Sequence, residues 1–197
     1  TSVNGINGDL NVSSVENSSG TIEADIVVVG IGVLPCQNLA EKAGIETNNG
    51  IVVNEFCISS DSNIFSAGDC TLHPSAFYKR DIRLESVHNA IEQGKTVASS
   101  IMEEFVPYNQ IPWFWSDQYN LKFQIAGLNN DYDEYIVRGR PEDNSFSVFY
   151  FKDGFMISSD CVNSAPEHMM SRRFIFNRAE VDLDKLQNKE ISIKEVV

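Results

Sequence analysis

A short apolar run that ends in two glycines constrains the fold of this chain most. Ile26 to Val29 are four consecutive β-branched residues, and Gly30-Ile31-Gly32 follows directly. A strand that is apolar on both sides of its pleat is typical of a parallel sheet covered on both faces. The run therefore predicts an α/β fold. The glycines allow either close backbone approach to a dinucleotide or a tight structural turn.

Size and composition exclude several classes of protein. The 197 residues fit one or two domains, and a 42% hydrophobic content predicts a folded core rather than disorder. The net charge of −13 argues against nucleic-acid or anionic-membrane binding, and no apolar run reaches the roughly 20 residues of a membrane span. Four cysteines without a C-x-x-C pair favour a reducing, cytoplasmic setting. The histidines lack metal-ligand spacing, so we expect no metal site.

The spacing of apolar and turn-forming residues predicts the other elements. We expect short antiparallel strands over 3–23, a helix over 38–43, strands at 50–53 and 64–67, and a helix over 87–105 that buries its apolar face. A change of composition at 107–112 predicts a domain boundary. Beyond it we expect strands at 122–126, 134–138, 145–151 and 155–159, a helix over 166–177, a short helix capped by Asp182 or Asp184, and a frayed tail from Lys189.

Two polar motifs are candidates for a ligand site. Ile64 to Asp69 predicts a strand that ends in Gly68-Asp69, where a carboxylate can accept hydrogen bonds from the hydroxyl groups of a sugar-like chain. Glu85 and Ser86 precede the strongest predicted helix, and Ser86 is its expected N-cap. The N-terminus of this helix can stabilise negative charge. The alternatives are an ordinary strand-to-loop turn for Asp69 and a simple ion pair with Arg83 for Glu85.

An aromatic segment, Pro112-Trp113-Phe114-Trp115-Ser116-Asp117-Gln118, follows the expected boundary. Packed aromatic residues usually belong to a core, although two tryptophans beside polar residues can also lie against a flavin. Arg172, Arg173 and Arg178 lie on the last main predicted helix, where they form either a solvated basic face or a docking surface for an acidic protein.

The motifs GIGVLP, NIFSAGDC, IRLESVHNAIEQGK, PWFWSDQ and KFQIAGL occur in this order along the chain. Together they resemble the carboxyl-terminal half of the FAD-dependent ferredoxin and rubredoxin reductases, in the pyridine nucleotide-disulfide oxidoreductase class. The resemblance implies an α/β fragment of a two-dinucleotide-binding-domain flavoprotein plus a small α+β carboxyl-terminal domain. The expected limits are 1–29 for the end of the NAD(P)H-binding lobe, 30–110 for the closing part of the FAD lobe, and 111–197 for the reductase carboxyl-terminal domain.

The resemblance also implies roles for individual residues. Gly68 and Asp69 match the ribityl-binding segment, and the backbone of Ser86 and Val87 matches the segment at the flavin pyrimidine edge. Glu85 matches a residue near the nicotinamide, and Trp115 matches a tryptophan near the isoalloxazine on the side of electron transfer. The backbone at Gly30 and Gly32 matches the surroundings of bound NADH or NADPH. Of these, Trp115 and Glu85 are the expected catalytic residues.

The implied activity is hydride transfer from NAD(P)H to FAD, followed by single-electron transfer to a [2Fe–2S] ferredoxin or a rubredoxin. Both G-x-G-x-x-G fingerprints of the family are absent from this chain, which also begins without a methionine. We therefore expect a fragment that is inactive without the missing amino-terminal half. The alternatives are a non-catalytic interaction or assembly domain, and a thiol-disulfide flavoenzyme of the same class that acts through Cys70 or Cys36.

Overall fold

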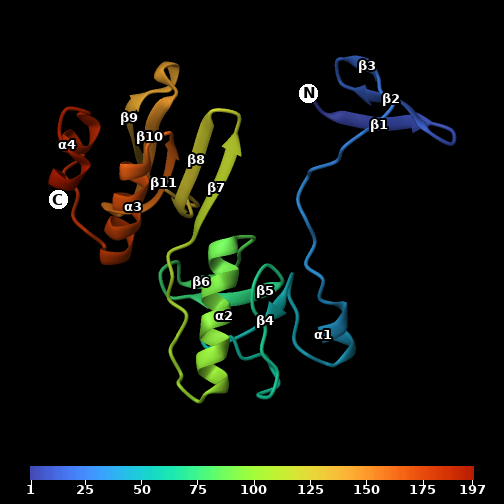
Figure 1. Ribbon diagram of the computed structural model, residues 1–197, viewed down its shortest axis with the longest axis horizontal. Helices are drawn as coiled ribbons and strands as arrows, with labels where there is room; N and C mark the ends of the chain where they lie inside the picture. The colour runs from blue at the N-terminus through green and yellow to red at the C-terminus, as the bar shows by residue number, and fades with distance from the viewer. The chain divides into compact units, whose positions relative to one another are not determined.

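Three antiparallel strands form the first sheet, in the order β1 (Val3–Gly8), β2 (Val12–Asn17) and β3 (Gly20–Glu23) (Figure 1). The computed structural model describes residues 1–197, and this sheet belongs to the first of two compact units, residues 1–34 and 35–197. The strands predicted over residues 3–23 are confirmed. Apolar side chains of the sheet, such as Ile6 and Ile22, are more than half exposed.

The prediction of a buried strand at Ile26–Val29 is wrong. These residues belong to no strand, and Ile26 and Val28 are 81% and 90% exposed. A strand needs a neighbouring ladder for its N–H and C=O groups, and this chain provides no partner strand for the run.

A mixed sheet opens the second unit, with β4 (Ile51–Val52) parallel to β5 (Thr71–Ser75) and β5 antiparallel to β6 (Arg80–Arg83). The predicted helix at 38–43 is present as α1 (Asn38–Lys42). The strand expected at Ile64–Ala67 is reduced to one bridge between Phe65 and Ile58. Sequence patterns also missed β5 and β6.

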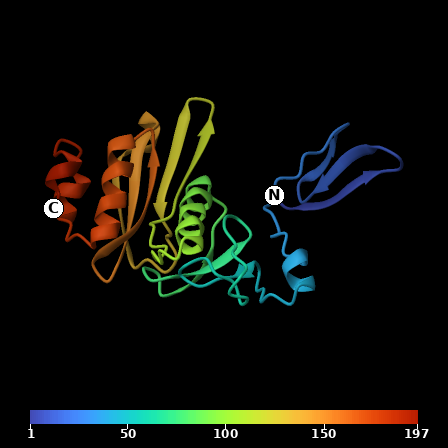
Figure 2. The same cartoon turned by 60° about the horizontal axis from the view of Figure 1, so that its bottom comes forward.

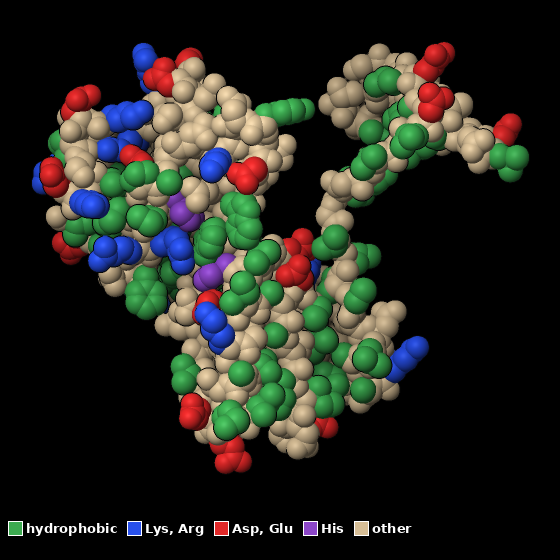
Figure 3. Space-filling view, viewed as in Figure 1, with side chains coloured by type: hydrophobic (Ala, Val, Ile, Leu, Met, Phe, Trp, Pro, Cys, Tyr) green, Lys and Arg blue, Asp and Glu red, His purple; other side chains and the backbone are tan.

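The face of helix α2 (Val87–Ile101) that was expected to be buried is exposed. Val87, Ile91 and Ile101 are each more than half exposed, whereas the buried residues of the helix are polar: Asn89, Gln93, Thr96 and Ser100. Figure 3 shows hydrophobic side chains across the solvent-facing side of this helix. The polar side is buried because its amides and hydroxyls pair with the β4–β6 layer and its loops, as in the Ser100 bond to the Phe56 carbonyl.

The carboxyl-terminal part is a five-stranded antiparallel sheet of order β7-β8-β11-β10-β9. Its strands are β7 (Trp113–Gln118), β8 (Leu121–Gly127), β9 (Glu134–Arg140), β10 (Ser145–Lys152) and β11 (Phe155–Val162). The predicted strands are confirmed, and β7 is an additional one. Asp153 and Gly154 form the β10–β11 turn with φ of 50° and 78°, as expected of an Asp-Gly hairpin.

Helices α3 (Ala165–Asn177) and α4 (Leu183–Gln187) lie on one side of this sheet (Figure 2). Phe149 and Phe151 of β10 pack there against Ile175 and Leu186, and all four are nearly or fully buried. Short 3₁₀ turns follow β9 (η1, Pro141–Asp143) and end the chain (η2, Ile193–Glu195). None of the helices has the length and apolar character needed to cross a membrane.

The expectation of a frayed tail from Lys189 is wrong. Ile193 and Val196 are 4% and 0% exposed and belong to the carboxyl-terminal core. Arg138 of β9 donates to the carbonyls of Leu186, Asn188 and Ile191. The guanidinium therefore holds the segment from α4 onward against the sheet. The predicted cap of α4 is confirmed at Asp182, which accepts from the Lys185 amide.

One tyrosine fastens the mixed sheet to the carboxyl-terminal sheet. The Tyr78 hydroxyl accepts from the Leu128 amide at 2.7 Å and donates to the Ile157 carbonyl at 3.3 Å. Gly127 makes this approach possible: its φ is +74°, and a Cβ there would lie 2.1 Å from the Ile157 carbonyl oxygen. The two layers of the second unit thus meet at a hydrogen-bonded junction.

Candidate functional site

The Gly68–Asp69 turn lies between the β4–β6 layer and α2. Gly68 is buried with a φ of +88°, and a Cβ at this position would contact the Ala90 side chain at 3.5 Å. Its amide donates to Gln93 Oε1 at 2.7 Å. Asp69 is exposed, and its backbone carbonyl accepts from Arg83 Nη1 at 3.0 Å. The turn therefore presents a carboxylate to solvent, and hydrogen bonds from Arg83 and to Gln93 hold its backbone in place.

The segment before α2 carries the second pair of expected site residues. Glu85 pairs with Arg83, with 2.9 Å between Oε1 and Nη1. Ser86 is the N-cap, as predicted: its hydroxyl accepts from the Asn89 amide and donates to the Trp113 carbonyl at 2.9 Å. The N–H groups of the first helical turn have no acceptor within the helix. The cap thus joins the start of α2 to β7 and leaves N–H groups available to an electronegative ligand.

A small cleft of about 130 Å³ brings four of the expected residues together. Glu85, Ser86 and Val87 line one side, and Phe114 and Trp115 line the other. Arg83 links Glu85 of this cleft to the Asp69 backbone. Gly30 and Gly32 belong to the first compact unit, and their contribution to a nucleotide site stays a prediction.

An aromatic and imidazole cluster extends from the cleft into the carboxyl-terminal part. Trp113 lies 5.1 Å from Trp115 and 5.6 Å from both His88 and His168, between ring centroids. Arg172 stacks on Trp113 at 5.0 Å. Burial, reinforced by the positive charge of Arg172, lowers the pKa of His168 to about 4 and also lowers the pKa of His88. The sequence did not reveal this cluster, because its members come from three elements.

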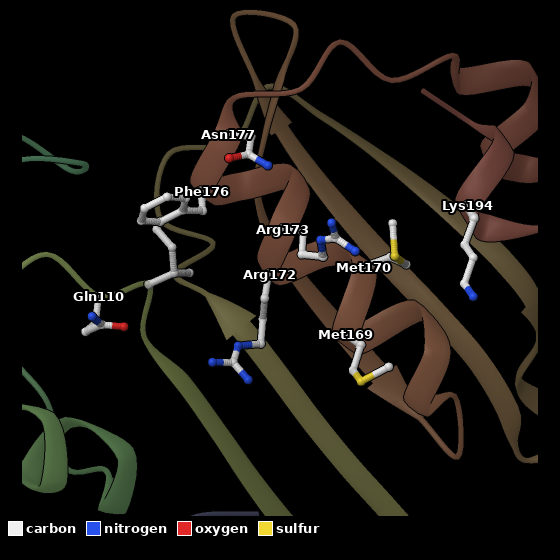
Figure 4. A pocket seen from close by; sticks show the side chains of 9 residues that line it. Gln110, Met169, Met170, Arg172, Arg173, Phe176, Asn177 and Lys194 are labelled. Atoms are coloured by element: carbon white, nitrogen blue, oxygen red, sulfur yellow. The ribbon is translucent and has the colours of Figure 1, made fainter.

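A basic and apolar groove of about 590 Å³ lies next to this cluster. Arg172, Arg173 and Lys194 supply positive charge along it, and Met169, Met170 and Phe176 supply apolar surface (Figure 4). In the space-filling view, Lys and Arg side chains gather around the histidines on this face (Figure 3). Arg178, expected in the same surface, instead stacks on Phe155 at 4.3 Å.

No disulfide links any of the four cysteines. All four are free thiols, and no three metal-ligating side chains cluster anywhere in the chain. Burial raises the pKa of Cys57 and Cys161 to about 11. The Cys70 sulfur makes long hydrogen bonds to the Ser66 hydroxyl at 3.8 Å and the Ala67 carbonyl at 3.9 Å. No observation favours the thiol-disulfide alternative.

The donor set of this region fits one part of a flavin nucleotide. An exposed carboxylate after a glycine of positive φ suits hydroxyl groups, and a helix N-terminus suits an electronegative ring edge. Trp115 is 46% exposed, so its ring is free to contact a ligand at the cleft. Neither G-x-G-x-x-G phosphate-binding motif occurs in the chain, so these residues fit only the ribityl and ring portions of such a nucleotide.

Two protein families match different parts of this chain. The pyridine nucleotide-disulphide oxidoreductase family matches residues 1–94, and the reductase C-terminal family matches residues 113–197. The first part of the chain thus matches one of these families and the carboxyl-terminal part matches the other. The predicted resemblance to ferredoxin reductases is confirmed, as is the fold class of a flavoprotein α/β fragment with an α+β carboxyl-terminal domain.

Three relatives illustrate the family match. The chain is 38% identical over 186 residues to the ferredoxin reductase subunit of a 5,5'-dehydrodivanillate O-demethylase from Sphingobium sp., covering 93% of this chain and 45% of the relative. It is 38% identical to putidaredoxin reductase of Pseudomonas putida, with 94% and 44% covered. The ferredoxin reductase structure from Rhodopseudomonas palustris matches with a TM-score of 0.92 at 35% identity, with 98% and 48% covered. The chain thus spans about half the length of these relatives.

Proposed function

We propose that this chain is the flavin- and acceptor-facing part of an NAD(P)H-dependent ferredoxin or rubredoxin reductase. The observation that carries the proposal is the cleft where Glu85, Ser86, Val87 and Trp115 meet, linked through Arg83 to the Gly68–Asp69 turn. The expected domain limits, 1–29, 30–110 and 111–197, belong to this proposal. So does a reducing, cytoplasmic setting, which four free cysteines favour.

When bound, FAD would supply the conversion of a two-electron hydride donor into single-electron steps. The Asp69 carboxylate accepts hydrogen bonds from ribityl hydroxyls. The first-turn N–H groups at Val87 stabilise negative charge at the pyrimidine edge. Glu85 accepts a hydrogen bond from the nicotinamide carboxamide, and the Trp115 ring covers the ligand where electrons leave. Gly30 and Gly32 give NAD(P)H room to approach the backbone.

The basic and apolar groove is the proposed docking surface for the electron acceptor. The whole chain carries a net charge of −13, which would repel an acidic iron–sulfur protein. Arg172, Arg173 and Lys194 reverse this sign locally, beside the Trp113–Trp115 pair. Complementary charge of this kind steers association and fixes orientation. One of the solved relatives is a covalent putidaredoxin reductase–putidaredoxin complex, at 37% identity and a TM-score of 0.92.

The exposed apolar surfaces belong to the same proposal. The outer face of α2 and the run at Ile26–Val29 have the composition of a buried interface, yet both are solvent-exposed. The relatives are about twice as long as this chain. We expect both surfaces to pack against the remainder of the flavin and nucleotide lobes, so that the chain by itself has no turnover.

Titration of the purified chain with FAD, followed by flavin absorbance and fluorescence, tests the proposal. We expect saturable binding by the chain, loss of binding in Asp69→Ala, and no change in Asp184→Ala, an equivalent substitution on the exposed side of α4. Absence of saturable binding would favour the non-catalytic interaction domain over a flavin half-site. Binding that Asp69→Ala leaves intact would remove Asp69 from the proposed site.

A further inference from the structure

Two side chains from different elements hold the peptide groups of the Gly68–Asp69 turn. Gln93 of α2 accepts from the Gly68 amide at 2.7 Å, and Arg83 of β6 donates to the Asp69 carbonyl at 3.0 Å. The Thr71 amide closes the turn by donating to the Gly68 carbonyl. With these groups occupied, the Asp69 side chain is the part of the turn that is free to meet a ligand.

Hydrogen bonding fixes the orientation of the Gln93 amide. Its Oε1 accepts from the Gly68 amide and from Asn89 Nδ2, so its Nε2 donates to His73 Nδ1 at 3.0 Å. His73 is therefore neutral with its proton on Nε2, and burial lowers its pKa to about 4. Gln93 is fully buried. Rotating this amide would leave a buried Gly68 donor without a partner, which makes the arrangement rigid.

Arg83 joins the two carboxylate-bearing segments of the site. Its Nη1 lies 2.9 Å from Glu85 Oε1 and 3.0 Å from the Asp69 carbonyl oxygen, and its side chain is 13% exposed. Gly50 leaves room for this side chain, because a Cβ there would lie 3.0 Å from Arg83 Cδ. A single guanidinium thus fixes the backbone at Asp69 relative to the side chain of Glu85.

We propose that Gln93 and Arg83 are positioning residues that set the Asp69 and Glu85 carboxylates for a flavin–nicotinamide ligand pair. The proposal rests on the proposed function. It assigns one site segment to Gln93 and two site segments to Arg83. Gln93 acts on the Gly68–Asp69 turn alone. Arg83 acts on that turn and on Glu85, so it couples the hydroxyl-binding side of the site to the amide-binding side.

Amide hydrogen exchange, measured by NMR on the isotopically labelled chain without ligand, tests the hydrogen bond from the Gly68 amide to Gln93. We expect Gln93→Leu to speed exchange at Gly68 at least about tenfold, and Gln118→Leu, an exposed control on β7, to leave it unchanged. Gln93→Glu keeps an acceptor for the Gly68 amide and should retain protection even if Gln93→Leu unfolds the chain. Equal exchange at Gly68 in Gln93→Leu and the unmodified chain, or loss of protection in a folded Gln93→Glu variant, would overturn the assignment.

The contact between Arg83 and the Glu85 carboxylate is tested by NMR on the same samples. Arg83→Gln should shift the carboxyl carbon signal of Glu85, whereas Gln93→Leu or Gln93→Glu should not. Arg83→Lys keeps a positive charge, so it should shift the Glu85 signal less than Arg83→Gln does. Arg140→Gln, an exposed arginine paired with Asp143, is the matched control. A Glu85 signal that Arg83→Gln leaves in place would overturn the coupling.

FAD titration separates this proposal from the proposed function. If the chain binds FAD, Arg83→Gln and Gln93→Leu should each weaken binding by about tenfold, although neither side chain is the ligand-binding carboxylate. Unchanged affinity in both variants would overturn the positioning role and leave the flavin assignment standing. If the chain binds no FAD, the proposed function fails, and the exchange and carboxyl signals still decide whether the two contacts hold the turn.

Discussion

Arg138 and Glu167 form a buried ion pair between β9 and α3, with 3.3 Å from Nε to Oε1 and 4% of the Arg138 side chain exposed. The same guanidinium donates to three backbone carbonyls of the carboxyl-terminal segment. Arg138→Met should lower the free energy of unfolding by about 3–5 kcal/mol, because it leaves a buried carboxylate and those carbonyls unpaired. Urea denaturation followed by tryptophan fluorescence measures this loss. Arg140→Met, at an exposed pair, should cost about 1 kcal/mol or less, and an equal loss in both variants would contradict the role of Arg138.

Acidification should destabilise the fold through two buried histidines. Burial lowers the pKa of His73 and His168 to about 4 from the usual 6.5. Between these values the unfolded chain binds more protons than the folded one, so this stabilisation is complete above about pH 6.5 and falls as pH falls, by up to about 1.4 kcal/mol per pH unit for each histidine. Urea midpoints at about pH 7.5 and 5 should differ less in His168→Gln than in the unmodified chain. Identical pH dependence in the two proteins would exclude His168 as a contributor.

The exposed face of α2 should tolerate a polar residue. Ile91 is 53% exposed, so Ile91→Gln should change the free energy of unfolding by about 0.5 kcal/mol or less. We expect the exposed apolar side chains of α2 to promote association between copies of the chain. Ile91→Gln should reduce this association, which light scattering over a dilution series detects. Phe149→Ala, at a fully buried position, should cost about 3–5 kcal/mol. A comparable loss in Ile91→Gln would place Ile91 in a packed core.

Removing the Tyr78 hydroxyl should loosen the junction between the two sheets. Tyr78→Phe leaves the Leu128 amide and the Ile157 carbonyl without their partner, at an expected cost of about 1–3 kcal/mol. Denaturation in urea gives the total, and amide exchange at Leu128 locates the effect. Tyr119→Phe, at a fully exposed tyrosine, should be neutral. Unchanged protection of Leu128 in Tyr78→Phe would argue against the hydrogen bond.

Charge reversal in the groove should weaken binding of an acidic [2Fe–2S] ferredoxin. Arg173→Glu places a negative charge in this otherwise basic groove, so the association rate should fall by about tenfold and depend less on salt. Surface plasmon resonance at two salt concentrations measures both effects. Arg140→Glu makes the same change of charge at η1. If the two variants bind equally well, the groove is not the docking surface.

Local sequence patterns correctly predicted the elements whose caps or turns depend on a few neighbouring residues. Ser86 caps α2 and Asp182 caps α4 because a short polar side chain satisfies the amides that follow. The Asp153-Gly154 hairpin follows in the same way from its left-handed backbone. The run at Ile26–Val29 and the apolar stripe of α2 failed as guides because periodicity identifies a buried face without identifying its partner.

The sequence suggested residues for the candidate site but not the contacts that connect them. The family resemblance supplied Asp69, Glu85 and Trp115, whereas the Arg83 bridge and the Gln93 contact span 14 and 25 positions of sequence. The cleft itself depends on the Ser86 hydroxyl reaching the Trp113 carbonyl on β7, a strand that the sequence pattern missed. Contacts of this range depend on the packing of whole elements, which periodicity does not encode.

The Tyr78 hydroxyl bridges chain segments that are made far apart in time. Its partners, Leu128 and Ile157, follow it by 50 and 79 positions. During synthesis from the amino terminus, β5, β6 and α2 are made before β11, so the hydroxyl cannot make both hydrogen bonds until residue 157 has been added. Joining of the two layers is therefore a late step of folding, and pairing over such sequence separation is slow. Closure of this junction must wait for β11, after which only α3, α4 and the carboxyl-terminal turn η2 are made.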